Sequence, residues 1–267
     1  MLLLWTPLAQ KIKKKLILQK PEVFPNPNAY LAILLFWNNS ASEVYVRLKQ
    51  KYANDLGIES KIFRDYSPEL IPSLNTDPNC IWIMIQLPLP DPLKSRKDEL
   101  CQSIIPSKDV DGLWHSPLVL PATVRGIFEL RNFYQLGSLK TRKIVVIGQS
   151  KLIGEPLAIE CKKQGAEVQT FDISNSPAQI ANACKNAEII FSCTGDLHFL
   201  TKEFIKTDKS QIIIDAGFWH INGKATGDVA FEEVEPYVKA ITPVPGGVWP
   251  LTVASLFLNL FDIQQYQ

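Results

Sequence analysis

A tyrosine and a lysine four positions apart form the first pair of residues that could do chemistry. Tyr45 and Lys49 lie in a segment with helical spacing, so both side chains project from one face of the expected helix. If that face is partly desolvated, the pKa of the lysine falls and its amine becomes suited to shuttling protons. The alternative is a lysine that faces solvent, as most lysines on helices do.

Two further polar groups lie where an expected strand and an expected turn end. Gln86 follows the apolar strand 81–85 and opens the run Gln86-Leu87-Pro88-Leu89-Pro90. Ligands bind at the carboxyl ends of strands in open parallel sheets, so Gln86 is placed to offer an amide donor and acceptor. The alternative is a hydrogen bond to its own loop. Asp111 lies in the turn 108–112, where acidic residues are usually structural.

The segment from Gly148 to Pro156 could bind a phosphate group. It follows an apolar strand and opens a helix, so backbone N–H groups and the helix N-terminus would face a pyrophosphate. It departs from the Gly-x-Gly-x-x-Gly pattern because Ser150 stands in place of the middle glycine. The alternative is a tight turn without a ligand. The residues expected to contact a cofactor here are Gly148, Gln149, Ser150 and Gly154.

A rigid loop, Ile241–Val248, precedes the last expected helix and is rich in proline and glycine. Loops of this kind often contact ligands. Other chemistries are disfavoured: the three histidines show no metal-ligand spacing, and Ser150 lacks the Gly-x-Ser-x-Gly setting of a serine hydrolase. The Tyr-x-x-x-Lys spacing also occurs in short-chain dehydrogenases, but there it follows the nucleotide-binding turn. The order of the two features in this chain excludes that family.

Alternating apolar runs and helical segments must position these residues. Continuous apolar strands separated by helices indicate parallel sheets covered on both faces. In the first half the pattern predicts a helix at 7–19, a strand at 30–36, a helix from Ser40 or Ser42 to Asp55, and strands at 62–64 and 81–85. In the second half it predicts strands at 143–147, 168–171, 188–192 and 211–215, with helices from 154, at 177–186, near 201–207 and at 251–264.

Composition divides the chain and excludes several classes of protein. Only 2 of 13 glycines precede residue 121, whereas 13 of 19 prolines lie at or before it, so a domain boundary is expected near 113–125. A formal charge of +1 disfavours nucleic-acid binding, and no apolar run reaches membrane-spanning length. The five cysteines form no Cys-x-x-Cys pair, which favours buried thiols in a reducing compartment. We therefore expect a cytoplasmic protein with no metal.

Five motifs in a fixed order resemble one family. They are Ser42–Lys49, Gln86–Pro90, Asp109–Gly112, Gly227–Val229 and Thr242–Val248. Together they are similar to the bifunctional methylenetetrahydrofolate dehydrogenase/methenyltetrahydrofolate cyclohydrolase family, over nearly the whole chain. The resemblance implies a two-domain α/β fold: a folate-binding catalytic domain, 1–118 plus 244–267, and a Rossmann-like dinucleotide-binding domain, 119–243. The terminal helix would return to the N-terminal domain, and the protein would be a homodimer.

The resemblance also implies site residues and a reaction in one-carbon metabolism. Lys49 matches the catalytic lysine, Tyr45 its partner that packs on the folate rings, Gln86 the glutamine that hydrogen-bonds the lysine, and Asp111 the aspartate that binds the pterin. Further substrate contacts would come from Leu87, Pro245, Gly246 and Gly247, and further cofactor contacts from Ile173 and Phe218. The implied activity is NAD(P)-dependent oxidation of methylenetetrahydrofolate to methenyltetrahydrofolate, followed by hydrolysis to formyltetrahydrofolate.

Some positions depart from the family pattern. Val124 stands where a proline is usual, the stretch 113–120 is short, and Trp249 stands where the family has glycine in its Pro-Gly-Gly-Val-Gly-Pro loop. The indole would either narrow the folate end of the site or pack outward. These departures leave two alternatives to the full activity: a folate-binding protein without turnover, or an enzyme that retains one of the two activities.

The tip of the strand 168–171 bears on the choice between NAD and NADP. Asp172 follows this strand, 24 positions after Gly148, close to the spacing of the acidic residue that accepts hydrogen bonds from the adenosine ribose. A carboxylate would repel the 2′-phosphate of NADP, which the resembling family mostly prefers. Ser174 and Lys151 are the nearby groups that could offset this repulsion. The alternative is an aspartate that only caps its own turn. We expect NAD to be used at least as well as NADP.

Overall fold

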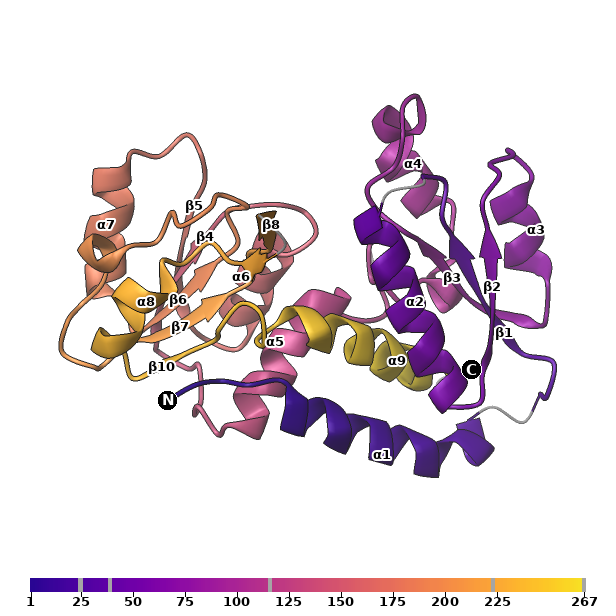
Figure 1. Cartoon of the computed structure of the whole chain (residues 1–267), viewed down its shortest axis with the longest axis horizontal. Coiled ribbons are helices and arrows are strands. Elements are labelled where there is room, and N and C mark those ends of the chain that lie inside the picture. The colour runs from indigo at the N-terminus through magenta and orange to yellow at the C-terminus, as the bar shows by residue number, and fades with distance from the viewer. Residues whose placement is uncertain (24–25, 38–39, 115–116, 222–223, 266–267) are drawn as a thin grey trace. The chain divides into compact units, whose positions relative to one another are not determined.

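The computed structural model describes residues 1–23, 26–37, 40–114, 117–221 and 224–265 (Figure 1). The chain forms two compact units. The first unit comprises Gln10–Ala122 and Val253–Gln267, and the second comprises Met1–Ala9 and Thr123–Thr252. The division expected from sequence had placed 1–9 and 244–252 with the N-terminal domain. The N-terminal segment lies in the second unit because Leu2 pairs in parallel with Ile241 and the N–H of Leu3 donates to the Ile241 carbonyl over 2.9 Å.

The first unit is built on a three-stranded parallel sheet of order β2-β1-β3. Its strands are β1 (Tyr30–Leu34), β2 (Glu59–Phe63) and β3 (Cys80–Ile85). Its helices are α2 (Ser40–Asp55), α3 (Leu70–Thr76) and α4 (Lys97–Gln102), with most of α1 (Thr6–Val23) and most of α9 (Trp249–Gln265). Buried residues of α3 and α4 pack on Ala32, Leu34 and Ile83 of the sheet.

The terminal helix α9 belongs largely to the first unit, as expected from sequence. Phe257 stacks on Tyr52 of α2 with ring centroids 4.7 Å apart and meets Trp82 of β3 edge to face at 5.2 Å. Asn259 is fully buried and donates to the carbonyl of Val110 at 2.7 Å. The helix therefore fixes the backbone between Asp109 and Asp111.

The second unit carries a five-stranded parallel sheet of order β10-β7-β6-β4-β5. Its strands are β4 (Lys143–Ile147), β5 (Glu167–Phe171), β6 (Ile189–Ser192), β7 (Ile212–Asp215) and β10 (Ala240–Ile241), with the hairpin β8 (Trp219–Ile221) and β9 (Lys224–Thr226). Its helices are α5 (Ala122–Phe133), α6 (Gly154–Lys163), α7 (Pro177–Asn186) and α8 (Phe231–Val234). Because the chain moves from β4 to β5 and back across to β6, right-handed crossovers place α6 and α7 on opposite faces, as Figure 1 shows.

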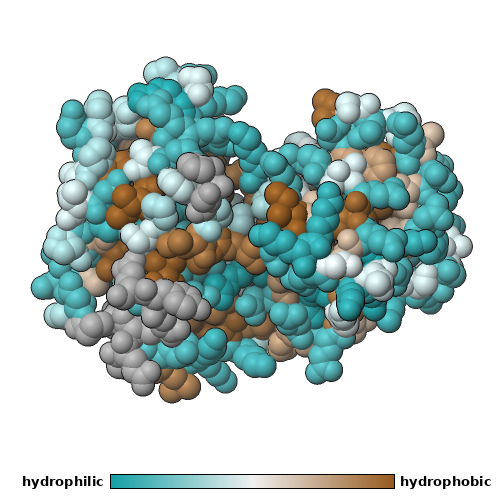
Figure 2. Space-filling view, turned by 180° about the vertical axis from the view of Figure 1, so that it is seen from behind, coloured by the Kyte–Doolittle hydropathy of each residue, from teal (hydrophilic) through white to brown (hydrophobic). Residues whose placement is uncertain are grey.

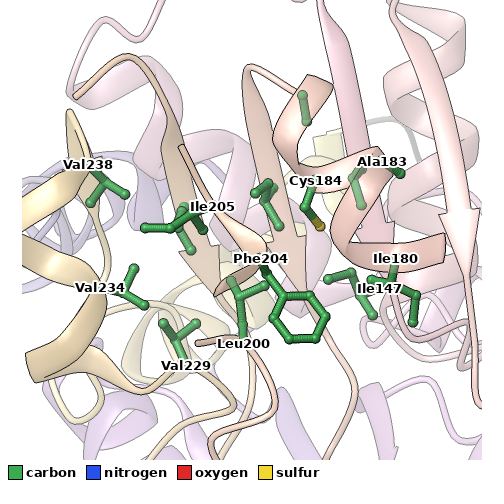
Figure 3. Packing of buried hydrophobic residues seen from close by; sticks show 14 of the residues in the cluster. Ile147, Ile180, Ala183, Cys184, Leu200, Phe204, Ile205, Val229, Val234 and Val238 are labelled. Atoms are coloured by element: carbon green, nitrogen blue, oxygen red, sulfur yellow. The ribbon is translucent and has the colours of Figure 1, made fainter. Parts of the chain in front are cut away.

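A continuous hydrophobic core lies between one face of this sheet and α7 (Figure 3). The residues that meet there include Ile147 of β4, Ile180 and Cys184 of α7, and Leu200 and Phe204 of the segment after β6. The sequence predicted a helix near 201–207, but only a short 3-10 helix, Lys202–Phe204, forms. Phe204 and Ile205 are both buried, and the backbone leaves the helical region at Ile205, with φ −110° and ψ 167°. That helix prediction was wrong.

The polarity of the surface and the state of the cysteines agree with the amino-acid composition. Hydrophilic side chains cover much of the face in Figure 2. All five cysteines are free and buried. Within the described residues, no helix combines the length and hydropathy that a membrane span requires.

Candidate active site

Helix α2 directs Lys49 into the first unit. Val46, Lys49 and Ala53 are spaced three and four positions apart and all three are buried, so they form the inner face of the helix. The Lys49 side chain is only 9% exposed and does not face solvent. Tyr45, one turn earlier, is half-buried, and burial raises its pKa to about 12. The sequence-based pair thus lies at the boundary between the core and a polar surface.

Strand β3 and the residue that follows it supply hydrogen-bond acceptors to the lysine. The Lys49 Nζ donates to Gln86 Oε1 at 3.0 Å and to Met84 Sδ at 3.1 Å. The Gln86 Nε2 donates to the carbonyl of Leu87 at 2.7 Å. Because the amide nitrogen is engaged by the loop, the amide oxygen must face the lysine. Gln86 therefore hydrogen-bonds its own loop and also accepts from the Lys49 amine.

The turn after Lys108 brings a carboxylate close enough to act on this lysine. Burial raises the pKa of Asp111 to about 6, and the charge of Lys49 opposes that rise. Burial lowers the pKa of Lys49 to about 8, and the charge of Asp111 opposes that fall. Asp109 is 4% exposed and accepts from the N–H groups of Gly112 at 3.1 Å and Trp114 at 2.9 Å, which shapes the turn.

The cluster of Lys49, Met84, Gln86 and Asp111 has the groups that acid–base chemistry requires. An amine with a pKa near 8 is neutral in part of its population at neutral pH and can take a proton from water. A thioether is a weak acceptor, so Met84 contributes little stabilisation to the ammonium form. The site therefore favours proton transfer over a permanent ion pair.

In the second unit the glycine turn leaves no room for side chains. Gly148 has φ +90°, and a Cβ there would lie 2.1 Å from the Cys193 carbonyl oxygen. A Cβ on Gly154 would lie 1.8 Å from the Gly148 carbonyl oxygen. Helix α6 begins at Gly154 without a side-chain cap. Backbone N–H groups at this helix N-terminus therefore fit a pyrophosphate, and the residues match a dinucleotide cofactor.

The tip of β5 is ordered by Asp172 itself. Asp172 Oδ1 accepts from the N–H of Ser174 at 2.9 Å and from its hydroxyl at 2.6 Å. Asp172 thus caps its own turn, and the Ser174 hydroxyl is already engaged. Ile173 is fully exposed beside them. A turn cap of this kind leaves a carboxylate at the tip of the strand, where a ribose would be recognised.

The indole of Trp249 packs on the loop that follows β7. Its Nε1 donates to the carbonyls of Ala216 and Gly217, each at 3.0 Å, and its ring lies 5.5 Å from that of Phe218. Trp249, Pro245, Gly246 and Gly247 all lie in the second unit, with Gly246 at φ +118°. Trp249 therefore restrains the loop that carries the expected cofactor contact Phe218.

The contacts of several polar and sulfur-containing residues near the candidate sites were not predicted from sequence. Met84 and Asp109 looked like core and turn residues, and only the fold shows what they contact. Asp215 and Asp228 are buried in the second unit. Asp228 belongs to the motif Gly227–Val229, but the sequence did not indicate that the two carboxylates are buried. No cluster of three potential metal ligands occurs among the residues that the structure describes.

These features define a two-unit α/β protein that combines a buried lysine and glutamine beside an aspartate with a parallel sheet suited to a dinucleotide. Residues 3–111 match the catalytic domain of the tetrahydrofolate dehydrogenase/cyclohydrolase family, and residues 121–267 match its NAD(P)-binding domain. The chain belongs to this family.

Individual relatives support the same assignment. The chain is 36% identical to a bifunctional FolD protein of Lactobacillus acidophilus, over 97% of this chain and 94% of that protein. A crystal structure of the bifunctional enzyme FolD from Campylobacter jejuni aligns with a TM-score of 0.90 at 32% identity, covering 100% and 99% of the two chains. The Trypanosoma brucei dehydrogenase-cyclohydrolase, complexed with NADP and an inhibitor, aligns with a TM-score of 0.89 at 25% identity, covering 100% and 97%.

Proposed function

We propose that this protein oxidises methylenetetrahydrofolate with a nicotinamide cofactor and hydrolyses the resulting methenyltetrahydrofolate to formyltetrahydrofolate. Membership of the family in both units supports the pair of activities. The single observation that carries the hydrolytic half is the buried Lys49, held by Gln86 with a pKa near 8. This chemistry needs a group that moves protons without itself being permanently charged.

Lys49 is proposed as the proton shuttle of the hydrolysis. The water oxygen forms a bond to the methenyl carbon while the neutral Lys49 amine takes the proton of that water. Lys49 then returns that proton to the folate nitrogen whose bond to this carbon breaks. The remaining hydroxyl proton leaves to water as the C=O bond forms, so the formyl group stays on the other nitrogen and one proton is released overall. Gln86 orients the amine throughout, because its own amide nitrogen is fixed by the Leu87 carbonyl. Asp111 and Tyr45 are proposed to bind the pterin and the folate rings, and Leu87 to line the same site.

The second unit is proposed to hold the dinucleotide. When bound, the cofactor accepts a hydride from the methylene carbon. The turn Gly148, Gln149, Ser150 and Gly154 would cradle the pyrophosphate, and Asp172 and Ile173 would border the adenosine ribose. Phe218 would contribute to the cofactor site, and Pro245, Gly246 and Gly247 to the folate site. The close backbone approach of Gly148 to Cys193 and of Gly154 to Gly148 supports this assignment.

The nicotinamide cofactor itself is proposed to be NAD at least as much as NADP. Asp172 places a carboxylate at the tip of β5, and the Ser174 hydroxyl already donates to it. A 2′-phosphate would therefore meet negative charge and no free hydroxyl from Ser174. The NADP complex of the T. brucei relative favours the other cofactor for that protein.

We expect Asp172→Ser to raise the ratio of kcat/KM for NADP over NAD by roughly tenfold, because one unfavourable charge next to the phosphate is removed. The measurement is initial rates with both cofactors for the unmodified protein and the variant. Asp208→Ser, which removes an exposed aspartate that caps its own turn through Ser210 before β7, serves as the control. A strong preference of the unmodified protein for NADP would contradict this interpretation of the tip.

Two separate assays test the proposed function. One follows reduced nicotinamide formed from methylenetetrahydrofolate, and the other follows hydrolysis of methenyltetrahydrofolate without any nicotinamide. Turnover in both supports the proposal. Folate binding without turnover in either would identify a folate-binding protein, and turnover in one assay alone would show that a single activity survives.

The assembly and location complete the proposal. A homodimer follows from the resemblance to the family. A cytoplasmic location is supported by five free, buried thiols, which suit a reducing compartment.

A further inference from the structure

A buried aspartate anchors the loop that follows β6. Asp228 is fully buried, and its Oδ2 accepts from the N–H of Thr194 at 2.7 Å and of Gly195 at 3.2 Å. The hydroxyl of Ser192 lies 3.4 Å from the same oxygen. Its Oδ1 is buried and has no hydrogen-bond partner within the described residues. One carboxylate oxygen therefore holds the loop while the other retains an uncompensated lone pair.

A second carboxylate completes the anchor. Asp215 Oδ1 accepts from the N–H of Gly217 at 2.8 Å and of Asp228 at 3.1 Å, and its Oδ2 accepts from Val229 at 2.9 Å. Burial raises the pKa of Asp215 to about 7, and the charge of Asp228 adds to the rise. Within the described part of the chain, neither carboxylate forms a salt bridge. Backbone dipoles are their main compensation.

The glycines show how closely the backbone surrounds these carboxylates. A Cβ on Gly217 would lie 2.0 Å from Asp228 Oδ1, and a Cβ on Gly227 would lie 2.0 Å from Asp215 Oδ2. By contrast, a Cβ on Gly195 would meet no atom within 4 Å. The loop held by Asp228 is thus tightly packed beneath and open on its outer side.

The order of the strands places this loop beside one half of a bound dinucleotide. The glycine turn follows β4, and the Asp172 tip follows β5 on one side of it. Strands β6 and β7 lie on the other side of β4. A dinucleotide that crosses the sheet at the glycine turn, with its adenosine over β5, must lay its nicotinamide half over the ends of β6 and β7.

We propose that Asp228 is a positioning residue of the nicotinamide half of the cofactor site, and that its buried charge favours the oxidised over the reduced cofactor. The inference rests on the proposed function, since it requires a nicotinamide cofactor. The oxidised ring carries a positive charge and the reduced ring is neutral. A carboxylate in a low-dielectric setting therefore stabilises the first more than the second.

Asp228→Asn separates the charge from the geometry. The asparagine keeps an oxygen for the N–H groups of Thr194 and Gly195 but removes the charge. We expect the Kd of the oxidised cofactor to rise roughly three- to tenfold and that of the reduced cofactor to change less than about twofold. Titration of the purified protein with NAD, NADH, NADP and NADPH gives these values without turnover.

Two further variants complete the experiment. Asp208→Asn is the control: Asp208 accepts from the N–H and hydroxyl of Ser210 in the same unit, but it is exposed and precedes β7, at the opposite end of the sheet. Its ratio of oxidised to reduced Kd should match that of the unmodified protein. Ser192→Ala removes a donor to Asp228 Oδ2, so it should shift the ratio about twofold in the direction opposite to Asp228→Asn. This variant tests the proposal even if Asp228→Asn does not fold.

The outcomes distinguish this inference from the proposed function. If the unmodified protein binds no nicotinamide cofactor, the proposed function fails. If it binds the cofactors but both Asp228→Asn and Ser192→Ala leave the ratio unchanged, or Asp208→Asn shifts it as much, the role of Asp228 is overturned. Equal weakening of both cofactor forms by Asp228→Asn would also overturn it, because that is the effect of a purely structural residue.

Discussion

Lys49→Ala is expected to lower the rate of methenyltetrahydrofolate hydrolysis by at least about 100-fold while the protein stays folded. General acid–base groups typically contribute factors of this size. Lys49 is the amine that Gln86 orients and that burial brings to a pKa near 8. The measurement is the hydrolysis rate at saturating substrate, with circular dichroism as the test of folding.

Lys51→Ala is the matched control for this variant. Lys51 lies on the same helix, is exposed, and pairs with Asp55 at 3.2 Å. Its loss should leave the hydrolysis rate unchanged. A folded Lys49→Ala protein that hydrolyses methenyltetrahydrofolate at the full rate would contradict the assignment of Lys49 as the proton shuttle.

The same pKa predicts how stability and rate depend on pH. The pKa of Lys49 falls from 10.5 to about 8 on folding, so the unfolded chain binds more protons between these values. Burial of the charged Lys49 ammonium lowers the free energy of unfolding by about 3 kcal/mol below pH 8. This loss of stability disappears as the pH rises to about 10.5. We expect the free energy of unfolding to rise over that range in the unmodified protein more than in Lys49→Met. The hydrolysis rate should rise with pH through about 8 for the same reason. A flat difference between the two unfolding profiles would contradict the pKa assigned to Lys49.

Gly148→Ala is expected to have the largest effect on the second unit. The alanine would be strained at φ +90°, and its Cβ would overlap the backbone of Cys193 and Thr194. Strain of this type costs about 1–2 kcal/mol and the overlap adds to it, so we expect a loss of more than about 3 kcal/mol. The glycine turn would move, and nicotinamide binding should weaken beyond detection. Thermal unfolding and cofactor titration measure both effects.

Gly165→Ala isolates the contribution of the backbone overlap. Gly165 has φ +83°, but a Cβ there would meet only Lys140 side-chain and Cα atoms at 3.4 Å or more. This variant should lose only the strain energy and keep its cofactor affinity. Equal destabilisation by the two substitutions would show that the close approach at Gly148 has no energetic weight.

The sequence predicted the elements best where local signals agree. The helix expected at 177–186 agrees with α7 (Pro177–Asn186), and the structure shows local signals at its start: Ser176 and Gln179 form a capping box, and Pro177 occupies the first turn. Strand β4 was equally clear as an apolar run that stops at Gly148. Helix α5 was missed even though Val124, Ile127 and Phe128 have helical spacing and are buried. Gly126 lies inside this helix, and glycine lowers the helix propensity of the segment.

The residues that complete the site depend on contacts that spacing cannot show. From sequence, Met84 is a core residue of a buried strand. Its contact with Lys49 arises only because α2 packs against β3 in the fold. Asp228 lies 34 positions from Thr194, and Asn259 lies 149 positions from Val110. Pairings of this range follow from the order of strands and from the return of α9, neither of which leaves a periodic signal in the sequence.

The stoichiometry of the products in one reaction mixture tests the two proposed activities together. Purified protein, methylenetetrahydrofolate and NAD or NADP are combined, and reduced nicotinamide and formyltetrahydrofolate are quantified together over time. We predict that both products accumulate, with one formyl product for each reduced nicotinamide once the intermediate is consumed. Bound folate with neither product, or reduced nicotinamide with formyl product forming no faster than without the protein, would contradict it.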